Sequence, residues 1–286
     1  MKYFIYSILF FSTSVLAFSN ENIEPKVLVL IVASDDLPVY IKEQEIWRSY
    51  MHRDREHFEV YFIKVDSELQ SDYELSFDVI WSKVENNVST GMVHRTLLSI
   101  EALMPRIEEF DYVLRTNLSS FYVFPRLLKF INTLPRNNCY CGVIGHAGVP
   151  FVSGAGFLLS RDLVKKMVSE KESLLAPSPV YEEDLIIGKF FYDRNIDMIP
   201  ASRINFLTLS DWMDGKDSIP ENIFHFRTKN LDAERRLHDE IFIQRELLNM
   251  FYLWDCLSPK SAFLQHNSKD EKRHHTTHIS SLYLPI

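Results

Sequence analysis

A continuous aliphatic run near the start of the chain constrains its fold more than any other segment. After Lys26, residues 27–33 are all aliphatic, and Ser34-Asp-Asp36 ends the run. A run that is apolar on both faces is typical of a buried strand in a parallel sheet, because a half-exposed strand would alternate apolar and polar residues. Residues 40–51 follow with helical spacing. The domain therefore begins with a strand and a helix, the unit from which parallel sheets are built.

Strands and helices continue to alternate along the chain. We expect further strands at residues 58–65, 77–81, 111–115, 141–145 and 196–200, and helices at residues 91–107, 125–134, 162–168 and 182–194. A glycine-rich turn is expected at residues 153–156. This alternation predicts an α/β domain of three layers, α/β/α, in which helices cover both faces of a mostly parallel central sheet.

The two ends of the chain differ from its middle. Residues 1–24 combine an early lysine, an apolar stretch and a polar linker, as a secretory signal peptide or a short signal-anchor does. The stretch is shorter than the roughly 20 residues of a membrane-spanning helix, which favours cleavage, and contact with a membrane is expected only through an uncleaved segment. This predicts a protein of the secretory pathway, in the ER or Golgi lumen or secreted. One large domain is expected over residues 25–257, and residues 258–286 form a polar, poorly ordered tail.

The charge balance argues against a nucleic-acid partner. The 286 residues include 31 basic and 39 acidic ones, for a formal net charge of −8. Binding to a phosphate backbone requires clustered lysines and arginines. The sequence also lacks a phosphate-binding loop that ends in Gly-Lys-Ser/Thr, a Gly-x-Ser-x-Gly nucleophile elbow and a His-Glu-x-x-His zinc helix.

Three polar segments remain as candidates for a site. They are residues 115–121 after an expected strand, residues 152–162 with two glycines, and residues 182–188 with three acids at a helix start. In an open α/β sheet, ligands bind where strands reach their carboxyl ends. Glycines let the backbone approach a bulky ligand, and a carboxylate can serve as a general base.

Two of these segments resemble motifs of the inverting β-1,3-glycosyltransferases of the Fringe and β-1,3-galactosyltransferase type, which adopt the GT-A fold. Ser153-Gly-Ala-Gly-Phe-Leu-Leu-Ser-Arg-Asp-Leu163 is similar to the family's Ser/Gly-Gly-x-Gly-Tyr-x-Leu-Ser-x-Asp segment, and Glu183-Asp-Leu-Ile-Ile-Gly188 resembles its Glu-Asp-Val-x-x-Gly motif. The spacing also fits, and the likeness spans about residues 77–197. It implies a GT-A-like nucleotide-sugar-binding fold that transfers a sugar with inversion. The implied donor is a UDP-sugar, and the acceptor is a hydroxyl of a glycan or glycoprotein.

The resemblance also implies roles for individual residues. Asp184 corresponds to the catalytic base that deprotonates the acceptor hydroxyl, against the alternative that the acids of this segment only cap a helix. Gly154 and Gly156 shape the pocket, with a plain tight turn as the competing interpretation. The predicted donor-binding residues are Arg115, Asn117, Ser119, Gly154, Gly156, Glu183, Arg227 and Lys229.

The chain departs from the family at the motif that holds the metal. Where the family has Lys-Thr-Asp-Asp-Asp, this sequence has Arg115-Thr-Asn-Leu-Ser119, a degenerate DxD motif. The lost carboxylates would hold Mn²⁺, and the amide of Asn117 and the hydroxyl of Ser119 are much weaker ligands for a hard cation. His225 corresponds by resemblance to a histidine that completes the metal site, and the alternative is a half-buried strand histidine.

Three functional hypotheses follow from this departure. The motif binds Mn²⁺ weakly; or Arg115, Arg227 and Lys229 stabilise the diphosphate in place of a metal; or the domain has lost catalysis and binds a glycan or a protein partner. For Arg115, the alternative to a ligand contact is a salt bridge with Asp111 or with an acid of a neighbouring helix.

Overall fold

The central element of the protein is an eight-stranded sheet with the order β3-β4-β2-β1-β5-β8-β7-β9. The structure is a computed structural model, and it describes residues 24–84, 91–176 and 182–253. The strands are β1 (Val27–Val32), β2 (Phe58–Val65), β3 (Tyr73–Ser76), β4 (Val79–Ser82), β5 (Tyr112–Asn117), β7 (Tyr140–Ala147), β8 (Val149–Ser160) and β9 (Met198–Pro200). All of them except β3 and β8 run in one direction. The predicted α/β class with a mostly parallel central sheet is confirmed.

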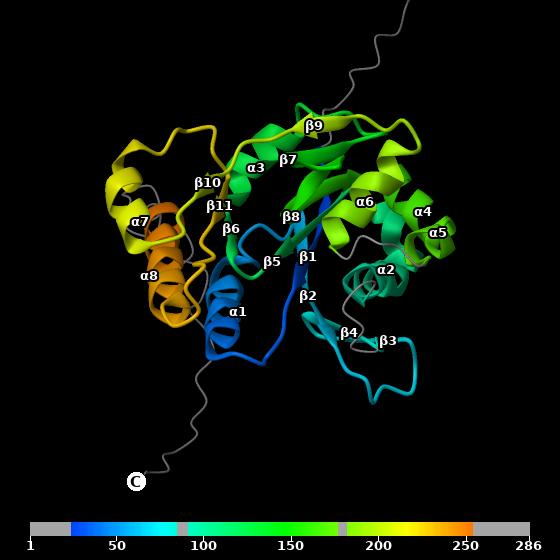
Figure 1. The fold of residues 1–286 in the computed structure, drawn as a ribbon, viewed down its shortest axis with the longest axis horizontal. Helices are drawn as coiled ribbons and strands as arrows, with labels where there is room; N and C mark the ends of the chain where they lie inside the picture. Colours follow the sequence, from blue (N-terminus) through cyan, green and yellow to red (C-terminus); the bar gives the residue numbers. More distant parts are fainter. Residues whose placement is uncertain (1–23, 85–90, 177–181, 254–286) are drawn as a thin grey trace, which may run out of the picture.

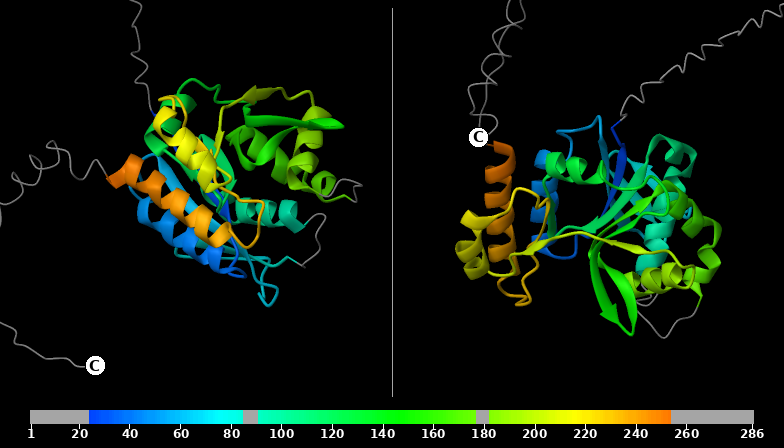
Figure 2. Two further views of the ribbon diagram at one scale, coloured as in Figure 1. Left: turned by 60° about the vertical axis from the view of Figure 1, so that its left-hand side comes forward. Right: turned by 90° about the horizontal axis from the view of Figure 1, so that it is seen from above.

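Helices cover both faces of this sheet (Figures 1 and 2). On one face lie α1 (Pro38–Tyr50), α3 (Phe124–Ile131) and α8 (Arg236–Leu248), and on the other lie α2 (Gly91–Leu103), α4 (Arg161–Ser169), α5 (Lys171–Leu175) and α6 (Glu183–Tyr192). Each set of helices buries its apolar side chains in its own cluster against the sheet. This is the three-layer α/β/α arrangement expected from the sequence, and it is consistent with a GT-A-like fold.

A second, smaller sheet lies beside the central one. It has the order β10-β11-β6 and consists of β6 (Ser120–Tyr122), β10 (Ile204–Asn205) and β11 (His225–Arg227). Figure 1 shows it on the side of the molecule where α7 (Leu209–Gly215) and α8 lie. Because β6 follows β5 after two residues, the chain passes from the large sheet to the small one at Leu118 and Ser119.

Two sequence-based expectations for secondary structure are wrong. Residues 153–156 form no turn; they lie inside β8, where Gly156 pairs with Thr116 of β5. A Cβ on Gly156 would lie 1.9 Å from the Tyr122 hydroxyl, so glycine serves close packing there. The expected helix at residues 91–107 ends at Leu103, because Pro105 has no N–H to continue it, and a 3₁₀ turn, Met104–Glu109, follows. Strand β3 and helices α7 and α8 were not expected.

The carboxyl ends of β1, β2 and β5 meet at one edge of the sheet, where Val32 pairs with both Ile63 and Asn117. Side chains of two helices hydrogen-bond to the chain just after Asn117. The Leu118 carbonyl accepts hydrogen bonds from Trp47 Nε1 of α1 and from Gln244 Nε2 of α8, both at 3.1 Å. These bonds fix the start of the connection between the two sheets.

The terminal segments assigned from the sequence lie almost wholly outside the described residues, which omit 1–23 and 254–286. Within the described part, no helix has the length and apolar character needed to cross a membrane.

Candidate functional site

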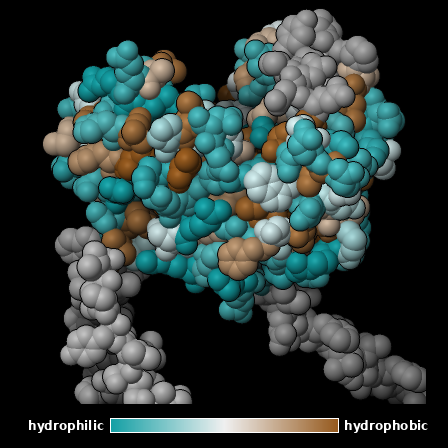
Figure 3. Space-filling model, turned by 90° about the horizontal axis from the view of Figure 1, so that it is seen from below, coloured by the Kyte–Doolittle hydropathy of each residue, from teal (hydrophilic) through white to brown (hydrophobic). Residues whose placement is uncertain are grey.

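A cleft of about 640 Å³ opens at the carboxyl ends of β1, β2, β4 and β5. Seen from below, the upper outline of the molecule is notched between two lobes, and hydrophilic and hydrophobic residues are interspersed on this face (Figure 3). The polar and aromatic residues that line the cleft are Ser34, Asp35, Asp36, Tyr40, Lys64, Ser67, Trp81, Arg95, Asn117, Ser119, Lys229 and Arg236. Its volume and its position at the strand ends are those of a small-molecule site in an open α/β sheet.

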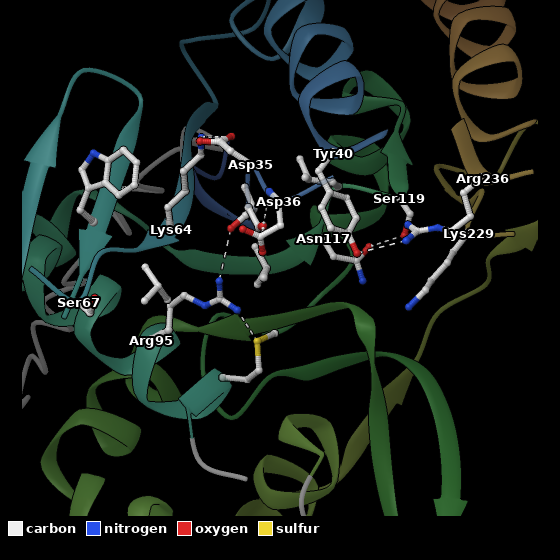
Figure 4. Close-up of a pocket in the computed structure, with 17 residues that line it drawn as sticks. Asp35, Asp36, Tyr40, Lys64, Ser67, Arg95, Asn117, Ser119, Lys229 and Arg236 are labelled. Carbon is white, nitrogen blue, oxygen red and sulfur yellow. Dashed lines mark hydrogen bonds and ion pairs between the residues drawn. The ribbon is translucent and has the colours of Figure 1, made fainter. Parts of the chain in front are cut away.

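Four cations face this cleft (Figure 4). Lys64 is paired with Asp35 at 2.7 Å, and Arg236 with Glu240 at 2.7 Å. Arg95 and Lys229 form no ion pair with any described residue. Burial lowers the pKa of Arg95, but a guanidinium stays charged in proteins. The negative charges of Glu183 and Asp36 act on Arg95, and Asp36 also lines the cleft, but the cations that line the cleft outnumber its acids. The cleft therefore keeps an excess of positive charge for an anionic ligand.

Asn117 and Ser119, the residues of the degenerate metal motif, do line the cleft. The Asn117 amide oxygen already accepts hydrogen bonds from Ser119 Oγ at 3.1 Å and from Ser120 Oγ at 3.2 Å. Within the described ranges, no three His, Cys, Asp or Glu side chains gather as metal ligands. A neutral amide oxygen that is already engaged, beside hydroxyl groups, does not fit the preference of a hard divalent cation for carboxylates.

His225 lies away from the cleft, in β11 of the small sheet. Its side chain is buried and its ring stacks on Tyr122, with 4.3 Å between ring centroids. Its Nε2 lies 3.2 Å from Ser120 Oγ. Burial, followed by the charges of Arg203 and Arg227, holds the pKa of His225 well below its ordinary value. The structure thus places His225 in a strand, as the alternative from the sequence had it, but buries it more fully than the half-buried histidine of that alternative.

Arg115 and Glu183 form a buried ion pair, and neither lines the cleft. Arg115 also donates to the Gly154 carbonyl at 2.5 Å, and Thr96 of α2 donates to Glu183 at 2.6 Å. Burial raises the pKa of Glu183, and the positive charge of Arg115 opposes that rise. Arg115 therefore has the partner that the sequence offered as an alternative, an acid of a neighbouring helix.

Asp184 lies half-buried in the first turn of α6, beside β8. Its Oδ2 accepts a hydrogen bond from the Gly154 N–H at 2.9 Å, and a Cβ on Gly154 would lie 3.3 Å from that oxygen. The Gly154 carbonyl in turn lies 3.5 Å from Asn117 Nδ2. A chain of contacts thus leads from the cleft through Asn117 and Gly154 to Asp184.

Sequence reasoning missed several residues of the cleft, notably Asp35, Lys64, Trp81 and Arg95. The available signal was their position. Asp35 comes three residues after the end of the first strand, and strand ends are where sites form in this class of fold. Of the predicted basic residues, Lys229 lines the cleft, whereas Arg227 lies outside it, near Arg203.

Comparisons with known proteins give only distant similarity. No family model matches the chain, and no curated protein matches it. Among solved structures, it is similar to a glycosyltransferase involved in the glycosylation of the major capsid of PBCV-1, with 10% identity, a TM-score of 0.48, and coverage of 77% of this chain and 100% of that one. It is also similar to the glycosyltransferase GlyE of Streptococcus pneumoniae TIGR4, with 15% identity, a TM-score of 0.41, and coverage of 79% of this chain and 64% of that one. Identities and TM-scores this low establish no activity for this chain.

Proposed function

We propose that this protein is a glycosyltransferase that moves a sugar from a nucleotide-sugar, a UDP-sugar, to a hydroxyl of a glycan or glycoprotein, with inversion. The observation that carries the proposal is the path of contacts from the cationic cleft through Asn117 and Gly154 to Asp184. The path joins a site for a charged donor to a carboxylate that could accept a proton.

The cleft supplies what a nucleotide diphosphate requires. Arg95 and Lys229 reach into it without an ion pair to any described residue, so they can stabilise the charge of the leaving diphosphate. Trp81 offers an aromatic face toward a nucleobase at the end of the cleft near Lys64, whose ammonium lies 5.5 Å from the Trp81 ring centroid. We therefore propose transfer that does not depend on Mn²⁺.

The chemical step is a single displacement at the anomeric carbon. The acceptor oxygen forms the new glycosidic bond while the bond from the anomeric carbon to the diphosphate breaks, and the diphosphate leaves with the electron pair. The acceptor hydroxyl loses its proton to the Asp184 carboxylate as its oxygen attacks. Attack opposite the leaving group inverts the configuration. The composition of residues 1–24 further leads us to propose that this reaction takes place in the secretory pathway or outside the cell.

The proposal is tested by release of UDP from a panel of UDP-sugars offered to the purified protein with candidate glycans. We expect turnover with at least one donor, unchanged by a chelator, and a loss of about 10²- to 10⁴-fold in Asp184→Asn. Asp193→Asn is the matched control, because Asp193 caps the other end of α6 and its one ion pair among the described residues is with exposed Lys189.

Each contrary result has a distinct meaning. Activity that disappears in the chelator contradicts the metal-independent mechanism. UDP binding without turnover of any donor contradicts catalysis and supports a binding module with the same fold. Full activity in Asp184→Asn removes Asp184 as the base.

A further inference from the structure

Two neighbouring arginines lie outside the cleft, at the small sheet. Arg203 donates from Nε to Asn205 Oδ1 at 2.9 Å and from Nη1 to Ser153 Oγ at 3.2 Å. Arg227 lies in the central strand β11, opposite Asn205 of β10, and its charge acts on Arg203, which directly precedes β10. Both side chains are half-buried.

No acid neutralises this arginine pair within the part of the chain that the structure describes. Arg203 has only an amide and a hydroxyl as partners, and the buried Nε of Arg227 has no hydrogen-bond partner. Burial, followed by the charge of Arg227, lowers the pKa of Arg203. Because a guanidinium does not lose its proton in proteins, the repulsion persists until an anion offsets it.

The position of the pair indicates which ligand would bring that anion. Ser153, which accepts the Arg203 hydrogen bond, directly precedes Gly154, whose N–H holds Asp184. The two arginines do not line the cleft, and Arg95 and Lys229 do. A diphosphate in the cleft thus has cations of its own. An anion at Arg203 and Arg227 would instead lie near Asp184, the proposed base, and therefore near the acceptor hydroxyl that Asp184 deprotonates.

We propose that Arg203 and Arg227 bind an acidic group of the acceptor, a carboxylate, sulfate or phosphate. This inference rests on the proposed function, since it takes Asp184 as the residue beside the acceptor hydroxyl. Two neighbouring guanidinium groups can donate several charge-assisted hydrogen bonds to such a group, and they select against a neutral acceptor because their charges would then stay uncompensated. The acceptor is therefore an acidic glycan, such as one that ends in a uronic acid or carries a sulfate.

The test is an array of glycan pairs whose members differ only by the acidic group, for example a terminal glucuronic acid against a terminal glucose. We expect the protein to bind acidic members at least about tenfold more tightly, which corresponds to about 1.4 kcal/mol. Arg203→Gln and Arg227→Gln should each remove most of that preference and leave UDP affinity unchanged. Arg245→Gln is the matched control, because Arg245 is an exposed arginine of α8.

The outcomes separate this inference from the proposed function. Equal binding of paired glycans, or binding of none, overturns it. Loss of UDP affinity in Arg203→Gln and Arg227→Gln also overturns it, by assigning the arginines to the donor diphosphate. A protein that keeps its preference for acidic glycans but transfers no sugar supports the acidic-group site and contradicts catalysis alone.

Discussion

Two groups of arginines lie near residues 153–154: Arg115 by itself, and Arg203 together with Arg227. The groups differ in what balances their positive charge. Arg115 is almost fully buried, 3% exposed, and is paired with Glu183. Arg203 and Arg227 are half-buried and have no acidic partner among the described residues. A fully buried cation requires a counter-charge within the protein. A partly exposed cation is stabilised by solvent and remains available to an anionic ligand. The arginine of the degenerate DxD motif, Arg115, therefore has a structural role. The arginines proposed to bind a ligand, Arg203 and Arg227, lie outside that motif.

A pair of acids elsewhere shows another way to relieve repulsion between like charges. Glu43 of α1 and Glu240 of α8 are both fully buried, and burial, followed by the charge of Glu240, raises the pKa of Glu43 well above its ordinary value. A carboxyl group can take up a proton and become neutral, which removes the conflict. An arginine cannot lose its proton and become neutral in this way. Two neighbouring arginines therefore indicate an external anion more strongly than two neighbouring acids indicate an external cation.

The largest expected effect comes from breaking the buried ion pair. Glu183→Ala leaves Arg115 buried without a counter-charge, and we expect a loss of about 3–5 kcal/mol in the free energy of unfolding. Urea titration followed by circular dichroism measures it. Glu182→Ala is the matched control, since Glu182 is exposed and precedes α6. A normal unfolding midpoint for Glu183→Ala would show that Arg115 is balanced by something other than this acid.

The second-largest effect is expected at Gly156, where β8 packs closely against Tyr122. Gly156→Ala places a methyl group 1.9 Å from the Tyr122 hydroxyl, and overpacking of this kind costs about 1–3 kcal/mol. Combining it with Tyr122→Phe removes the clashing oxygen and should restore part of the loss. Gly154→Ala serves for comparison, because its new methyl group would meet Asp184 Oδ2 at 3.3 Å and should cost less stability. Equal losses in the two alanine variants would contradict the packing explanation.

The buried acid pair should make stability depend on pH. The folded-state pKa of Glu43 is raised, so the folded protein holds a proton that the unfolded chain releases near its ordinary pKa of 4.5. Stability is therefore highest below that value and declines as pH rises through the folded-state pKa. Glu43→Gln should flatten this decline in urea midpoints measured between about pH 4.5 and 8. Glu45→Gln, which changes an exposed glutamate of the same helix, should keep the slope of the unchanged protein.

The sequence predicted the fold better than it predicted the partners of individual side chains. Local patterns located most strands, and the rule that sites form at strand ends singled out Asn117 and Ser119, which line the cleft. The partner of Arg115 lies 68 residues away in α6, and no local pattern could select Glu183 over Asp111. Arg203 gave no signal at all, because its environment arises only when β10 joins β11. Contacts between distant segments are set by tertiary packing, which periodicity does not encode.

The smallest expected effect on stability is that of a substitution at Arg203, which forms no ion pair with any described residue. Arg203→Gln removes one of two neighbouring like charges and keeps an amide nitrogen near the position of Arg203 Nε, which can still donate to Asn205, so the free energy of unfolding should change by no more than about 0.5 kcal/mol. Inorganic sulfate provides a second measurement, because an anion that binds the folded state raises its melting temperature. We expect sulfate to stabilise the unchanged protein more than Arg203→Gln, with Arg245→Gln responding like the unchanged protein. A large loss of stability in Arg203→Gln would instead give Arg203 the same structural role as Arg115 and remove the contrast between the two groups.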